Sequence, residues 1–385
     1  MSAAAPILWS LPWVLGPAIG LARSVRSRLL ENEPADPPVP APLVSIVIPA
    51  RNELRNIERC VRFVLTTTYP AVEVIVVDDH SADGTGDVAR AIAREDPRLR
   101  VIDAPPLPPD WFGKQWACAT GAAEARGELL LFIDADTRHT PTLVSRSVNA
   151  LRRRDADLFS IAGHQEMHSF WERIVQPQVF GILALRYGGT EDVSTTTNPK
   201  NAIANGQFLL VRRAAYDAIG GHALVRGRAA EDLAFAQEFV RAGRRIALMM
   251  GTSLLSTHMY ASLRELVDGW RKNIFAGGRE SVLGGRLGRS LFPALLVATP
   301  LVGLAPVVAL VLGALGVAST AWLIWGAIGV SAAVLFYGAV YAFMRAPIGY
   351  AVLYPLGLLV VLYIASSAVR RGSRVGWKGR EYTAQ

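Results

Sequence analysis

Two long stretches of the chain carry no charged side chain. Leu291 to Met344 contains no Asp, Glu, Lys or Arg, and neither does Ala346 to Val369, whereas Val44 to Arg289 has charges throughout. A helix needs about 17–25 mainly apolar residues to cross a bilayer. The first stretch therefore predicts two membrane-spanning helices with a turn near residues 316–320. Pro347 to Val369 predicts a third segment in or at the membrane.

A shorter apolar segment, Ile7 to Ala22, lies near the start of the chain and is followed by Arg23, Arg26 and Arg28. We interpret it as a short membrane anchor, with an interfacial helix as the alternative. Basic residues favour the cytoplasmic side of a membrane, so the domain that follows is expected there. The Pro-rich residues 31–42 predict an extended linker to that domain.

The tail after Val369 is basic, with Arg370, Arg371, Arg374, Lys378 and Arg380. This charge predicts a cytoplasmic tail, yet three full crossings that start from the cytoplasm would leave the tail outside. Pro355 interrupts the third apolar segment. Because such a segment can bend back where protein covers it, we expect residues 347–369 to be re-entrant or interfacial, or one span to be miscounted.

The charged region predicts an α/β domain. Four short apolar runs rich in branched residues have the pattern of parallel strands buried on both faces. They are Val44–Ile48, Glu73–Val77, Leu99–Ile102 and Leu129–Ile133. Helical patterns lie between them over Glu53–Leu65 and Asp87–Arg94. This order predicts a parallel sheet with its ligand beyond the carboxyl ends of the strands.

Composition changes this picture little. The chain has 385 residues, 51% of them apolar and 19% charged, with a net charge of +8. These values, with the uncharged stretches, exclude a purely soluble enzyme, a disordered protein and a disulfide scaffold. Cys60 and Cys118 lack zinc-site spacing and are expected to stay reduced. The basic residues are scattered or near the membrane segments, which favours anionic lipid headgroups over nucleic acid as their partner.

Candidate site residues follow the predicted strands where a ligand is expected. They are Ala50, Arg51 and Glu53 after the first strand, Asp78 and Asp79 after the second, and Asp134 and Asp136 after the fourth. The chain has neither a dinucleotide-binding nor a P-loop glycine motif at the first strand, which argues against both classes. Two carboxylates one residue apart suit Mg²⁺ shared with substrate phosphates, although a solvated turn is the alternative.

These motifs resemble those of family 2 glycosyltransferases with the GT-A fold. The resemblance runs from Val44 to about Gly278 through VSIVIPARNE, EVIVVDDHSADGT, LLLFIDAD, Glu231-Asp232 and Trp270-Arg271. The segments PPLPPDWFGKQWA and VGWKGREY resemble membrane glycosyltransferases associated with hopanoid and carotenoid pathways. The resemblance implies a GT-A, Rossmann-like nucleotide-sugar-binding domain with an N-terminal anchor and C-terminal transmembrane helices.

The resemblance also implies a role for each motif in donor binding. Asp78 and Asp79 would contact the base or ribose of a nucleoside-diphosphate sugar, in a pocket that Ala50, Arg51 and Glu53 also line. Lys114 would face the nucleotide, with a surface lysine as the alternative. Asp134 and Asp136 would hold a divalent cation, Mg²⁺ or Mn²⁺, and Asp134 would also contact the donor.

The Glu231-Asp232 pair would supply catalysis, with Asp232 as the general base. An acceptor hydroxyl has a pKa far above 7, so a positioned carboxylate must take its proton during attack. Trp270, Arg271 and Lys272 stand where processive relatives carry Q-x-x-R-W, and the order of residues here differs. They are expected to face the diphosphate and the acceptor, with an interfacial helix as the alternative.

We therefore expect an inverting, metal-dependent transfer of a sugar to a membrane lipid such as a carotenoid or hopanoid, at the cytoplasmic membrane and without nucleic acid. A processive polysaccharide synthase and a catalytically silent scaffold are the alternatives. The expected regions are an anchor (1–28), a linker (29–42), a GT-A domain (43–280), a multi-pass membrane region (281–370) and a basic cytoplasmic tail (371–385).

Overall fold

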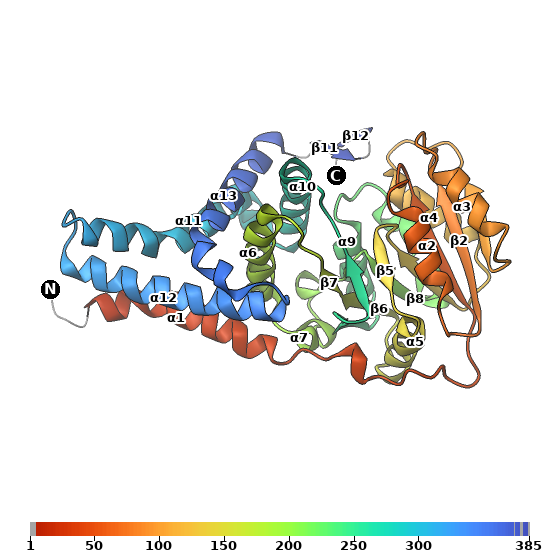
Figure 1. Cartoon of the computed structure of the whole chain (residues 1–385), viewed down its shortest axis with the longest axis horizontal. Coiled ribbons are helices and arrows are strands. Elements are labelled where there is room, and N and C mark those ends of the chain that lie inside the picture. Colours follow the sequence, from red (N-terminus) through yellow and green to blue (C-terminus); the bar gives the residue numbers. More distant parts are fainter. Residues whose placement is uncertain (1–4, 373, 378–379, 384–385) are drawn as a thin grey trace. The chain divides into compact units, whose positions relative to one another are not determined.

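The computed structural model describes residues 5–372, 374–377 and 380–383, which form two compact units (Figure 1). Unit 1 comprises Met1–Arg26, Met167–Asp192 and Tyr260–Gly372. Unit 2 comprises Ser27–Glu166, Val193–Met259 and Ser373–Gln385. The chain thus passes from one unit to the other several times.

Unit 2 is built on a seven-stranded sheet with the order β3-β2-β1-β4-β8-β6-β9. The strands are β1 (Val44–Ala50), β2 (Val72–Asp78), β3 (Leu99–Asp103), β4 (Leu129–Ile133), β6 (Leu158–Ala162), β8 (Phe208–Arg212) and β9 (Ile246–Met250). The first four in this order are parallel, which confirms the prediction for them. Strand β8 is antiparallel to both of its neighbours, so the complete sheet is mixed.

Helices cover this sheet because one face of each is apolar. Helix α2 (Ile57–Leu65) buries Ile57, Cys60, Val61 and Val64. Those side chains join the branched residues of β1, β2 and β4 in one core. The other helices of unit 2 are η1 (Leu30–Asn32), α3 (Thr85–Ala93), α4 (Gly113–Glu124), α5 (Leu143–Arg153), η2 (Pro199–Asn201), α8 (Arg213–Ala218), η3 (Gly221–Val225) and α9 (Glu231–Arg241). Both cysteines are buried and free, in agreement with the prediction.

Two smaller sheets complete unit 2. Strands β5 (Thr137–His139), β10 (Leu255–Thr257) and β7 (His164–Gln165) form the first. Strands β11 (Arg374–Trp377) and β12 (Arg380–Thr383) form an antiparallel hairpin. The hairpin lies within the predicted basic tail.

Unit 1 is helical. It contains α1 (Ala5–Ser24), α6 (Phe170–Tyr187), α10 (Leu263–Ser281), α11 (Gly285–Ala314), α12 (Thr320–Phe343), η4 (Ile348–Leu353) and α13 (Tyr354–Arg371), while α7 (Thr190–Ser194) leads back to unit 2. Within the described residues, α1, α11, α12 and residues 348–371 are long and apolar enough to cross a membrane. The predicted turn near residues 316–320 separates α11 from α12.

Helix α6 is one of the parts of unit 1 that the hydrophobic pattern did not indicate. It packs against α1, α12 and α13 and buries Gln176 and Gln178 completely. Glu172, Arg173 and Arg186 interrupt its apolar residues, so its sequence resembles that of a helix in the charged domain. A capping box at Ser169 and Glu172 fixes its first turn.

Candidate active site

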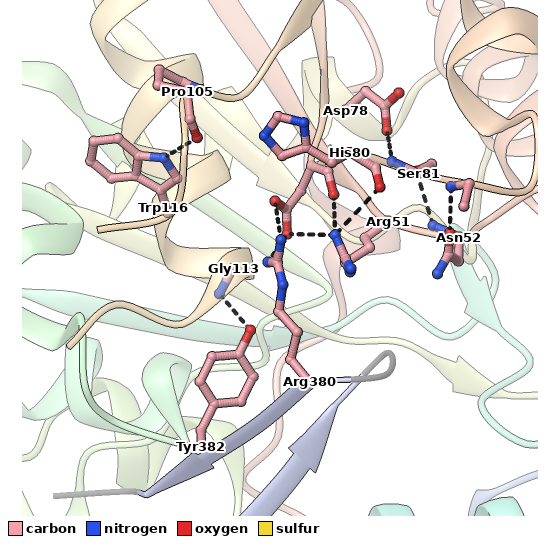
Figure 2. Close-up of polar contacts among 12 residues, drawn as sticks. Arg51, Asn52, Asp78, His80, Ser81, Pro105, Gly113, Trp116, Arg380 and Tyr382 are labelled. Carbon is pink, nitrogen blue, oxygen red and sulfur yellow. Dashed lines mark hydrogen bonds and ion pairs between the residues drawn. The ribbon is translucent and has the colours of Figure 1, made fainter. Parts of the chain in front are cut away.

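The carboxyl ends of β1 and β2 form one wall of the site. Ala50 ends β1, and its carbonyl oxygen accepts a hydrogen bond of 2.8 Å from the backbone N–H of Asp79. Asp78 ends β2, and its Oδ1 accepts a bond of 3.1 Å from the Ser81 N–H. These bonds hold both aspartates at the edge of the sheet, and Figure 2 shows the bond between Asp78 and Ser81.

Asp79 is almost completely buried and is surrounded by arginines. Its carboxylate accepts two hydrogen bonds from the guanidinium of Arg380, at 2.6 and 3.2 Å, and Nη1 of Arg51 lies 3.8 Å from Oδ2. Nη1 of Arg51 also donates to the carbonyl oxygen of Asp79. A buried carboxylate needs such compensation, and the two arginines provide it.

Glu53 connects this wall to the acidic pair after β4. Its backbone N–H donates to Thr85 Oγ1 at 2.8 Å, and its Oε2 accepts a bond of 3.0 Å from Asn56. Burial raises the pKa values of Asp134 and Asp136, and the charge of Glu53 raises both further. Glu53 is therefore electrostatically coupled to the pair, as well as packed against the start of α3.

Lys114 forms ion pairs with a residue that follows β4 and with the first residue of α9. It lies in the first turn of α4, and its Nζ is 2.7 Å from Asp134 Oδ1 and 2.8 Å from Glu231 Oε1. Burial alone would lower the pKa of Lys114, but the two carboxylates outweigh burial and raise that pKa well above its ordinary value. The lysine is therefore a charged link between two of the predicted motifs.

Asp136 has the chemistry of a cation ligand without a partner. Its Oδ1 is buried and has no hydrogen-bond partner among the described residues. Burial first, and then the charges of Asp134 and Glu53, raise the pKa of Asp136 to about 7. Within the described residues no group of three or more His, Cys, Asp or Glu side chains could hold a metal ion. Two carboxylates nevertheless suffice for Mg²⁺ that is shared with substrate phosphates, so the residues present fit such a cation.

Asp232 lies beside this cluster at the start of α9. Its Oδ2 accepts a hydrogen bond of 2.8 Å from the Gly206 N–H, and its Oδ1 accepts one of 2.8 Å from the Leu233 N–H. Burial and the charge of Glu231 raise the pKa of Asp232 to about 6. A Cβ at residue 206 would lie 3.1 Å from Asp232 Oδ2 and 3.2 Å from Lys114 Nζ. Glycine therefore lets the backbone approach both charged groups.

Trp270, Arg271 and Lys272 lie in unit 1, on α10, rather than in the unit that holds the acidic cluster. Arg271 Nε donates to Ser367 Oγ of α13 at 2.9 Å and Nη1 donates to Asp268. Trp270 is buried against Phe180 of α6. These contacts account for Trp270 and Arg271 as packing residues of unit 1, and their predicted role toward the donor stays a prediction.

Three contributors to the site were not predicted from the sequence motifs. Gly206 was not among the predicted site residues, and Arg380 was predicted only as a basic residue of the tail. Tyr382, whose hydroxyl accepts a hydrogen bond of 3.3 Å from the Gly113 N–H, was not considered by itself. The similarity of VGWKGREY to membrane glycosyltransferases was the one signal that pointed to the last two.

Comparison with known proteins bears on the family and the fold. Residues 45–220 match the family model described as Glycosyl transferase family 2, which confirms the resemblance seen in the motifs. The 4,4'-diaponeurosporenoate glycosyltransferase of Staphylococcus haemolyticus is 25% identical over 240 residues, or 61% of each chain. Glycosyltransferase AglE of Haloferax volcanii is 33% identical over 119 residues, 30% of this chain and 38% of that protein. The aligned region thus spans 61% of the length of the first of these relatives.

A solved structure shows the same fold over almost the whole chain. The mannosyltransferase PcManGT from Pyrobaculum calidifontis, determined in complex with GDP-Man and Mn²⁺, superposes with a TM-score of 0.55 at 18% sequence identity. The alignment covers 94% of this chain and 97% of that one. The predicted GT-A-like fold class is therefore confirmed.

Proposed function

We propose that this chain is a membrane-bound family 2 glycosyltransferase that moves a sugar from a nucleoside-diphosphate donor to a lipid. The observation that carries the proposal is the cluster in which Lys114 bridges Asp134 and Glu231, with Asp232 next to Glu231. The cluster lies at the strand ends where α/β folds bind their ligands. The family match over residues 45–220 supports the same reaction class.

The donor is assigned to the edge formed by β1, β2 and β4. Asp78 and Asp79 would contact the nucleoside, and Ala50, Arg51 and Glu53 would line its pocket. Asp134 and Asp136 would hold Mg²⁺ or Mn²⁺, which supplies positive charge to the departing diphosphate when it is bound. The unpartnered Oδ1 of Asp136 supports this assignment, as does the Mn²⁺ in the PcManGT complex.

Asp232 is assigned as the general base. The acceptor oxygen forms a bond to the anomeric carbon, its proton passes to the Asp232 carboxylate, and the bond from the anomeric carbon to the diphosphate oxygen breaks. This single displacement inverts the anomeric configuration. The two backbone N–H groups of Gly206 and Leu233 fix the carboxylate for this transfer.

The acceptor is assigned as a lipid with a hydroxyl or carboxyl group that is reached from the cytoplasmic leaflet. Four helices that are apolar enough to span a membrane support this choice, and so do relatives named for diaponeurosporenoate. The arginines after α1 support a cytoplasmic position for unit 2.

The test is to supply the purified full-length protein in lipid nanodiscs with candidate nucleotide sugars, Mn²⁺ and a membrane lipid extract. Mass spectrometry should detect a lipid that has gained one hexose, and Asp232→Asn should abolish it while Asp217→Asn, an exposed substitution on α8, should not. A product with many added sugars would indicate a processive synthase. Absence of both lipid product and nucleotide release with every donor would indicate a silent scaffold.

A further inference from the structure

The C-terminal hairpin places two side chains against the predicted nucleoside pocket. Arg380 and Tyr382 lie two positions apart on β12, so they project from the same face of the strand. Figure 2 shows them reaching toward Arg51 and Gly113, respectively. Their hydrogen-bond partners, Asp79 and Gly113, belong to unit 2, as does the hairpin itself.

Arg380 and Asp79 form a bidentate ion pair. The two terminal nitrogens of Arg380 meet the two carboxylate oxygens of Asp79, which is the paired arrangement that makes arginine–carboxylate bonds strong. The Asp79 side chain is 2% exposed and that of Arg380 is 23% exposed. This pair is thus shielded from solvent, unlike a surface ion pair.

The second contact connects the hairpin to the helix that carries Lys114. The Tyr382 hydroxyl accepts a bond from the Gly113 N–H, and its ring packs on Phe112 with the ring centres 4.3 Å apart. Gly113 is the first residue of α4, where backbone N–H groups have no partner within the helix. One strand therefore contacts the β2 end of the pocket and the start of α4.

We propose that the β11–β12 hairpin is part of the nucleotide-binding site, a role that rests on the proposed function. Arg380 is a positioning residue that holds the Asp79 carboxylate for the nucleoside, and Tyr382 fixes the turn before Lys114. A carboxylate has about four acceptor positions, and a paired arginine uses two of them. Asp79 can therefore bind Arg380 and a nucleoside hydroxyl at the same time. Arg380 also offsets negative charge where an anionic donor must bind.

The test measures binding of UDP, GDP, ADP, CDP and TDP, each with Mn²⁺, to the full-length protein in nanodiscs by calorimetry. For the nucleotide that the wild type binds, Arg380→Gln should weaken affinity at least about tenfold, since it removes a charged, hydrogen-bonded partner of a buried group. Arg380→Lys should retain part of the affinity. Arg371→Gln removes the same charge from an exposed position at the end of α13 and should leave affinity unchanged.

Kinetics and a double-mutant cycle test whether Arg380 acts by positioning Asp79. With the matching sugar nucleotide, Arg380→Gln should raise the donor KM and leave kcat within about twofold. In a double-mutant cycle, Arg380→Gln should add little to the effect of Asp79→Asn. Tyr382→Phe, which keeps the ring and loses the bond to Gly113, should weaken binding less than Arg380→Gln, and it serves as the test if Arg380→Gln does not fold.

The outcomes separate this inference from the proposed function. If the wild type bound none of the five nucleotides, both would be overturned. If the wild type bound one of them and the folded Arg380→Gln protein bound it equally well, the hairpin would have no part in the site. Tighter binding by Arg380→Gln would mean that Arg380 competes with the nucleotide, and it would likewise overturn the inference.

Discussion

At the residue scale, the site consists of buried and half-buried carboxylates with different surroundings. Asp79 is paired with arginines, Asp134 and Glu231 share Lys114, Asp136 has an unpartnered oxygen, and Asp232 accepts backbone bonds. Environments of this kind give similar side chains different protonation and different roles. Predictions for Asp232 and Asp136 test these differences.

The first concerns Asp232 as the base. Asp232→Asn should lower kcat by about 10²–10⁴-fold, the usual contribution of a positioned general base, with little change in the donor KM. Asp217→Asn is the matched control, because Asp217 is an exposed aspartate on α8. Steady-state kinetics with the identified donor and lipid check this prediction. A variant that kept more than half of the wild-type kcat would rule out Asp232 as the base.

The pH dependence tests the same assignment. The base must be ionised, and the pKa of Asp232 is about 6, so kcat/KM should fall as the pH drops below about 6.

The native state binds more protons than the unfolded one between pH 3.8 and about 6, so ionisation of Asp232 lowers stability as pH rises through this window. Asp232→Asn should therefore raise the Tm at pH 7 relative to the wild type. An unchanged Tm would show that burial imposes no cost on this carboxylate.

The second prediction concerns Asp136 and the divalent cation. Treatment with EDTA should stop transfer, and Mn²⁺ should restore it. Asp136→Asn should weaken Mn²⁺ binding at least about tenfold, as measured by electron paramagnetic resonance of free Mn²⁺ in the presence of the nucleotide. Asp87→Asn is a suitable control because the Asp87 side chain is 90% exposed. Transfer that continued in EDTA would exclude a required cation.

At the element scale, α4 is placed by a close approach to the sheet. A Cβ at Gly121 would lie 2.4 Å from Val47 Cγ1 and 3.0 Å from Val77 Cγ2. Glycine therefore lets α4 lie near β1 and β2, and this contact sets the position of Lys114, which lies about two turns earlier in the same helix. The site depends on this contact although Gly121 carries no functional group.

Gly121→Val should accordingly destabilise unit 2 by about 1–3 kcal/mol, the usual cost of added atoms in a packed interface. The Tm should fall by several degrees, and Lys114 should be displaced from its two carboxylates. Ala123→Val adds a similar side chain at an exposed position of α4 and should have little effect. Equal Tm values for Gly121→Val and Ala123→Val would contradict this prediction, because they would show that the sheet accommodates a larger side chain at residue 121.

The elements themselves were largely predictable. Strand β4 was predicted with the observed bounds, Leu129–Ile133, and α2 was predicted to end at Leu65 as observed, because buried runs and an amphipathic face are local signals. The antiparallel pairing of β8 was not predictable, since the partner of a strand is a long-range property. The hairpin was missed for the same reason: its contacts with Asp79 and Gly113 leave no local pattern in a short basic segment.

At the scale of the whole molecule, the hairpin bears on the number of membrane crossings. The chain enters unit 2 at Ser27 and returns to it at Ser373, so both junctions are expected on the same side of a membrane. If α11 and α12 cross and return, residues 348–371 do not cross. Helix α13 packs on α6, and the segment that contains α6 is joined at both ends to unit 2. This arrangement favours the re-entrant or interfacial alternative for residues 347–369.

Single cysteines introduced at Asp36, Val317 and Arg371 test this topology, because both native cysteines are buried. In intact cells a membrane-impermeant maleimide should label the cysteine at 317 and leave those at 36 and 371 unlabelled until the cells are permeabilised. The exposed side chain of Val317 makes this position a sensitive reporter. Labelling at 371 from outside would show that α13 crosses.

The contact between Arg380 and Asp79 also has a consequence for biogenesis. The two residues are 301 positions apart, and α10, α11, α12 and α13 all lie between them. Contacts of such high contact order close a long loop and form late. If the hairpin is part of the nucleotide site as proposed, that site is complete only after all four of these helices have been synthesised. Nascent chains that end before β12 would therefore lack a complete nucleotide site.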